Sequence, residues 1–136
     1  MGAEKERRAL ERARRAEAVR LLLRRELQHL PQRLLAPLVG INRNSLRKFL
    51  ALSEPERATW QRLQEWARDR PEPDTPLGAV ALAILASEFP APHRLRARRH
   101  LARTLARLYV ELDRQPPSWL VEELADAKEE PPGQAE

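Results

Sequence analysis

Apolar residues recur along this chain at the three- and four-residue spacing of helices that bury one face. No segment alternates polar and apolar residues, or gathers β-branched ones, as a strand would. We therefore predict an all-α fold. The first expected helix covers residues 4–30, as one helix or as two with a bend. A second helix begins at Pro31 and leads into a turn at 39–41. The remaining helices are expected at residues 42–50, 53–70, 76–89 and 92–114, with a last one from Pro117.

A stiff proline-rich segment, PEPDTP at residues 71–76, divides the pattern in two. We predict a domain over residues 1–70, a linker over 71–76 and a second helical domain over 77–128. The charged tail EEPPGQAE at residues 129–136 has the composition of a disordered segment.

The expected first helix changes character along its length. Residues 4–17 are almost wholly charged, whereas Val19, Leu22, Leu23, Leu27 and Leu30 form an apolar stripe. The charged half could be a basic arm that grips phosphate. It could also be a solvated helix, because Glu4, Glu6, Glu11 and Glu17 are interleaved with arginines at ion-pair spacing.

The second half of the chain contains a segment, PLGAVALAILASEF at residues 76–89, that is expected to be a helix apolar nearly all round. Its longest apolar run, residues 77–86, is too short to span a bilayer, and the helix must be covered on most sides. Either the first domain or a second copy of the chain could cover it. We favour a homodimer through this half.

The expected helix at 92–114 is two-faced. Its apolar stripe is Leu101, Leu105, Leu108 and Leu112, and its opposite stripe is Arg96, Arg99, Arg103, Arg107 and Arg114. The arginine stripe is equally consistent with a second nucleic-acid surface and with a solvated face. The last helix would contribute Trp119, Leu120, Val121 and Leu124.

The segment with the most specific pattern is QRLLAPLVGINRNSLRKFL, residues 32–50. Ala36 is small enough for two helices to cross closely, and Gly40 tolerates the positive φ of a tight turn. Leu46 and Phe49 are three residues apart and lie on one helical face. The spacing predicts a helix-turn-helix, in which Pro37 makes the first helix short or kinked.

Capping residues set the ends of the helices around this turn. Asn42 is suited to cap the second helix. Ser53 and Glu56 have the spacing of a capping box, with Pro55 between them, and predict another helix to about residue 70. Its inward stripe would be Trp60, Leu63, Trp66 and Ala67.

Taken together, LxxxVGINRNSLRKFLxLxxPxxxTWxxLxxW resembles the helical DNA-binding domains of phage-repressor-like transcription regulators. The resemblance covers about residues 19–70. It implies that the second helix enters the major groove of DNA, and such domains bind as dimers on two half-sites.

The polar residues of this segment have distinct expected roles. For base contact we predict Arg43, Asn44 and Arg47, since arginine pairs with guanine and asparagine with adenine through two hydrogen bonds. For phosphate contact we predict Gln32, Ser45, Lys48, Arg57 and Thr59.

Composition favours a polyanionic partner. Basic residues outnumber acidic ones by 25 to 20, for a net charge of +5. The chain has no cysteine, and its three histidines are scattered, so we expect no metal and no cofactor. No glycine-rich phosphate loop or nucleophile motif is present. We expect no enzyme and no catalytic residue.

The leading hypothesis is a sequence-specific double-stranded DNA-binding protein, a small prokaryotic or phage transcription regulator. One alternative is an adaptor or antitoxin-like factor whose second half binds a partner protein. Another is a nucleoid-type binder without sequence preference. The charged N-terminus lacks the apolar core of a signal peptide, so we expect a cytoplasmic, nucleoid-associated protein with no membrane partner.

Overall fold

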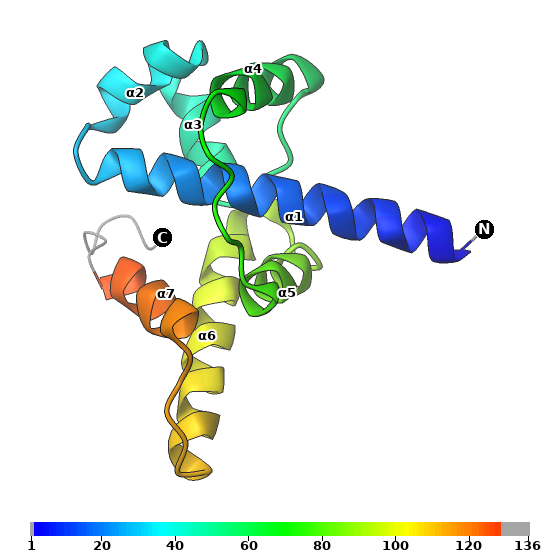
Figure 1. Cartoon of the computed structure of the whole chain (residues 1–136), viewed down its shortest axis with the longest axis vertical. Helices are drawn as coiled ribbons and strands as arrows, with labels where there is room; N and C mark the ends of the chain where they lie inside the picture. The colour runs from blue at the N-terminus through cyan, green and yellow to red at the C-terminus, as the bar shows by residue number, and fades with distance from the viewer. Residues whose placement is uncertain (1, 129–136) are drawn as a thin grey trace. The chain divides into compact units, whose positions relative to one another are not determined.

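The computed structural model describes residues 2–128, and over these residues it is all-helical, with no strand. The helices are α1 (Gly2–Leu27), α2 (Gln32–Val39), α3 (Arg43–Leu50), α4 (Arg57–Arg68), α5 (Leu77–Ala86), α6 (Arg94–Glu111) and α7 (Ser118–Lys128) (Figure 1). The all-α prediction is confirmed for this part of the chain. The expected disordered tail, 129–136, lies outside the described residues.

The chain divides into two compact units, Met1–Thr75 and Pro76–Glu136. The division falls within the proline-rich segment at 71–76. Most of that segment belongs to the first unit, where Glu72 pairs with Arg15 of α1 at 3.4 Å.

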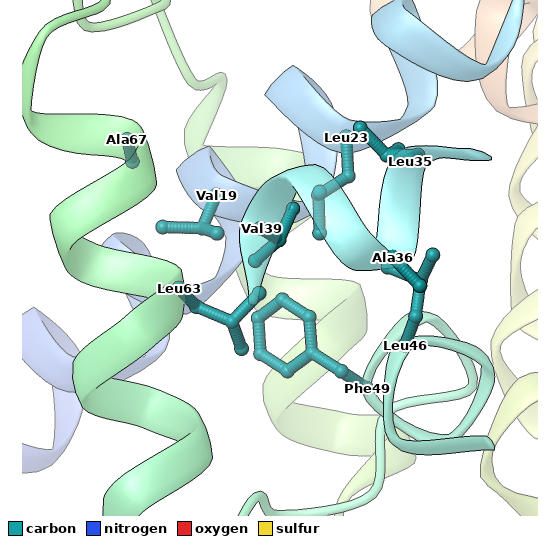
Figure 2. Packing of buried hydrophobic residues seen from close by; sticks show 9 residues of the cluster. All are labelled: Val19, Leu23, Leu35, Ala36, Val39, Leu46, Phe49, Leu63 and Ala67. Atoms are coloured by element: carbon teal, nitrogen blue, oxygen red, sulfur yellow. The ribbon is translucent and has the colours of Figure 1, made fainter. Parts of the chain in front are cut away.

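The core of the first unit draws on four helices. Figure 2 shows side chains of α1, α2, α3 and α4 gathered around one apolar centre. Its buried members are Val19, Leu23, Leu35, Ala36, Val39, Leu46, Phe49, Leu63 and Ala67. Trp60 and Trp66 pack against this cluster while remaining half-buried, which confirms the predicted inward stripe of α4.

The turn between α2 and α3 depends on Gly40. Its φ is +91°, in the left-handed region that glycine adopts without steric cost. The amide of Ile41 donates to Ala36 at 3.1 Å and the amide of Gly40 to Pro37 at 3.1 Å, which satisfies the last carbonyls of α2. As expected from Pro37, α2 is short, eight residues.

The predicted capping box at 53–56 is wrong. The chain leaves α3 through Leu52, whose φ is +71°, and the amide of Ser53 donates to the carbonyl of Lys48 at 3.0 Å. Ser53 is thereby used to close α3 rather than to open the next helix. Residues 53–56 have no regular secondary structure and Glu56 is extended, so that α4 begins only at Arg57 and has no side-chain cap.

The second unit is built from α5, α6 and α7. Its core joins Leu82, Ala102 and Leu120, one from each helix, with Leu101, Leu105 and Tyr109 among the residues packed against it. Gly78 allows a close approach between α5 and α7, because a Cβ there would overlap the indole of Trp119. The α6 helix is shorter than predicted at both ends, because residues 91–93 form a 3-10 turn and the helix ends at Glu111, before the left-handed Asp113.

The apolar faces of two helices in this unit are covered to different extents. The predicted leucine stripe of α6 is only partly covered, because Leu108 and Leu112 are 46% and 69% exposed. The α5 helix is covered on most sides, as expected: five of its ten residues are buried, and Leu77 and Leu85 remain exposed on one side.

Candidate nucleic-acid interface

The outer face of α3 is polar and cationic. Arg43, Asn44, Arg47 and Lys48 are all exposed. Successive helical residues are rotated by about 100°, and Leu46 and Phe49 are buried. Positions 44, 47 and 48 therefore point away from the core. No acidic residue occurs between residues 32 and 50.

The start of α3 is held by Asn42, as predicted. The amide of Ser45 donates a hydrogen bond to Asn42 Oδ1 at 2.7 Å. This cap satisfies one of the unpaired amides of the first turn. Ser45 itself is half-buried, and so is Gln32 at the first position of α2.

Two of the predicted base-contacting residues already interact with each other. A terminal nitrogen of Arg47 donates to Asn44 Oδ1 at 3.0 Å. The bond aligns the two side chains side by side on the exposed face. It also occupies the amide oxygen that asparagine would use to accept from adenine N6.

A buried arginine of α1 holds the far end of α3. Arg20 Nε donates to the carbonyl oxygen of Phe49 at 2.9 Å. Its guanidinium also lies 4.7 Å from the centre of the Phe49 ring. Arg20 in turn is near Glu17, with 3.7 Å between nitrogen and oxygen. The expectation that Glu17 belongs to a solvated, charged run is wrong, because its side chain is buried.

The turn has a second brace that the sequence pattern did not predict. Arg62 of α4 donates to the carbonyl oxygen of Gly40 at 3.0 Å. The bond ties the turn that orients α3 to the helix packed behind it. Its signal in the sequence is weak, since one arginine at an exposed position of α4 resembles any other.

Arg57 and Thr59 occupy the first turn of α4, as expected for residues near a helix start. Arg57 is exposed and Thr59 is half-buried. Two exposed carboxylates, Glu54 and Glu56, precede this turn. Acidic side chains therefore lie next to this helix end, whereas the exposed face of α3 has none in its own segment, residues 32–50.

Within residues 2–128 no group of three or more histidine, aspartate or glutamate side chains is placed to hold a metal ion. No helix in that part of the chain is long and apolar enough to cross a membrane. Comparisons with protein-family models, with curated proteins and with solved structures find no match to this chain.

Proposed function

We propose that this protein binds double-stranded DNA in a sequence-specific manner and acts as a small transcription regulator. The observation that carries the proposal is the outer face of α3, which is exposed, polar and free of acids. It is presented by a glycine turn and held in place by Arg20. A helix presented in this way fits the major groove.

In this proposal Arg43, Asn44 and Arg47 contact base edges. Lys48, Ser45 and Gln32 contact phosphates, which sets the position of the helix along the duplex. Arg57 and Thr59 are secondary candidates for phosphate contact, because Glu54 and Glu56 would repel a phosphate at the start of α4.

Selection of bound duplexes from a random pool tests the proposal directly. We expect enrichment of a defined sequence, and a two-fold-symmetric one if two copies bind together. Failure to enrich any sequence, with equal affinity for all duplexes, would favour the alternative of a nucleoid-type binder.

We further propose that the protein binds DNA as a homodimer formed through its second unit. One eight-residue helix contacts few bases, so two half-sites are needed for useful specificity. The interface that we propose includes Leu108, Val110 and Leu112, which are exposed at the C-terminal end of α6 and just after it. Figure 1 shows α5 beside the earlier part of α6 and only the returning chain beside its last turns.

The chain offers a matched control for this surface. Leu34 and Leu38 on α2 have the same spacing and nearly the same exposure, 44% and 68%. We expect Leu108→Asn with Leu112→Asn to give a monomer by sedimentation equilibrium, and Leu34→Asn with Leu38→Asn to leave the dimer intact. An unchanged dimer in the first variant would place the interface elsewhere.

A second candidate function is that of an adaptor whose second unit binds another protein. It is favoured by Leu77 and Leu85, which leave one side of the otherwise apolar α5 exposed. Light scattering on the purified chain separates the two candidates. A discrete dimer supports self-association, whereas a monomer or a polydisperse aggregate supports a missing partner.

A further inference from the structure

The α6 helix carries a second basic surface, on the side away from the core of its unit. We call Arg96, Arg99, Arg103 and Arg107 the arginine face. Arg99 is half-buried and the other three are exposed. From residue 89 to residue 110 the chain contains no acid, unlike the interleaved charges of α1.

The opposite side of α6 is already occupied. Leu101, Ala102 and Leu105 pack with Leu82 of α5 and Leu120 of α7. A basic helix that lies on a membrane needs a free apolar face to insert. Between residues 96 and 107 the apolar side chains of α6 are buried or half-buried, and the exposed Leu108 and Val110 lie only in its last turn. The charge pattern therefore favours a polyanion rather than a lipid surface.

The residue type and the spacing both suit phosphate. Arginine presents a planar set of donors that matches phosphate oxygens in pairs. Residues 96 to 107 span about 16 Å of helix at 1.5 Å per residue. The same length of duplex carries roughly ten phosphate charges.

We propose that the arginine face of α6 binds the phosphate backbone of duplex DNA without regard to sequence. This second surface lies on the second unit and does not depend on the assignment of α3. It would add affinity, and the salt dependence that accompanies phosphate contacts, to any duplex the protein meets.

The test measures the affinity of the full chain for a random-sequence DNA duplex between about 50 and 200 mM salt. The variant is Arg103→Ala with Arg107→Ala, two exposed positions on α6. Loss of two phosphate contacts should make the slope of log affinity against log salt shallower by about 1.8. Over that fourfold range of salt, the variant should lose roughly twelvefold less affinity than the unaltered protein.

The matched control is Arg7→Ala with Arg14→Ala, which removes the same charge from exposed positions of α1. This control should have the same slope of log affinity against log salt as the unaltered protein. Arg103→Lys with Arg107→Lys keeps the positive charges and should retain most of that slope. Equal slopes for the Arg103/Arg107 variant and the unaltered protein would overturn the proposal. So would an equal change in the control, which would indicate bulk charge alone.

Two further measurements separate this proposal from others. The protein should not co-sediment with vesicles of phosphatidylcholine and phosphatidylserine. Vesicle binding that depends on Arg103 and Arg107, with no change in the salt slope on DNA, would overturn the proposal. Discrimination between a selected and a random duplex should be unchanged in the Arg103/Arg107 variant. If α3 proves not to discriminate sequences, the slope on random duplex still tests α6.

Discussion

Arg20 of α1 donates a hydrogen bond from Nε to the carbonyl oxygen of Phe49, near the end of α3, at 2.9 Å. The two residues are 29 positions apart in the sequence, and the guanidinium is buried. This bond joins the long first helix to the helix proposed to enter DNA. The orientation of α3 therefore depends on a charged side chain inside the first unit.

We expect Arg20→Met to destabilise the protein by about 2 kcal/mol, because the Phe49 carbonyl loses its charged donor and the buried Glu17 carboxylate loses one of its two arginine neighbours, Arg20 and Arg24. Urea denaturation measures the change. Arg25→Met, on the exposed side of α1, is the control and should be nearly neutral. Adding Glu17→Gln to Arg20→Met should recover part of the loss, and a fully stable Arg20→Met would show that the bond contributes nothing.

A second buried ion pair holds the other unit together. Arg98 of α6 is 0% exposed and donates to both carboxylate oxygens of Glu123 of α7, at 2.9 and 2.8 Å. Glu123→Ala should cost about 3–5 kcal/mol, since it leaves the guanidinium buried without that partner. Calorimetric melting measures the loss.

The adjacent residue supplies the control for this pair. Glu122→Ala removes the same charge from an exposed position and should change stability little. Replacing both partners, Arg98→Met with Glu123→Leu, should be close to neutral, because no charge then remains buried. A double variant as unstable as Glu123→Ala would contradict this explanation.

These two arginines also mark the limit of what the sequence could predict. The turn at Gly40, the cap at Asn42 and the burial of Leu46 and Phe49 were predictable because they depend on residues within one or two turns. Arg20 and Arg98 were not, since their partners lie 29 and 25 residues away. A helical projection places Arg98 on the leucine side of α6, and this position was the one indication in the sequence that Arg98 is buried.

The errors have a common physical origin. Ser53 has the spacing of a helix cap. However, Leu52 adopts a left-handed backbone conformation, and the Ser53 amide then donates to the Lys48 carbonyl at the end of α3. Leu108 and Leu112 have the spacing of a buried stripe, but α6 extends past the residues that cover it. In each case the local sequence pattern was compatible both with the predicted structure and with the observed one, and tertiary packing determined which of them formed.

Gly78 sets helix propensity against packing. Alanine is favoured over glycine within a helix by about 1 kcal/mol, so propensity alone predicts that Gly78→Ala stabilises α5. The added Cβ would instead overlap the Trp119 ring. We expect net destabilisation of about 1–3 kcal/mol, measured by urea denaturation. In the background Trp119→Leu the same substitution should become neutral or stabilising; if it destabilises equally there, the ring is not the cause.

The proposed roles on α3 predict two different kinds of defect. Arg47→Ala should relax the preference at one base position, costing about 1–3 kcal/mol on the selected duplex and much less on random DNA. Lys48→Ala should instead weaken all duplexes alike and make the salt slope shallower by about 0.9. Parallel titrations of selected and random duplexes measure both effects.

Asn44 provides the finer test, because its Oδ1 accepts from Arg47 in the free protein. Arg47→Ala frees this oxygen, so the preference attributed to Asn44 should persist or sharpen while the preference attributed to Arg47 disappears. Asn44→Ala should show the reverse. Repeating the selection with each variant locates both positions. If Arg43→Ala with Arg47→Ala leaves binding to every duplex unchanged, α3 does not enter the groove.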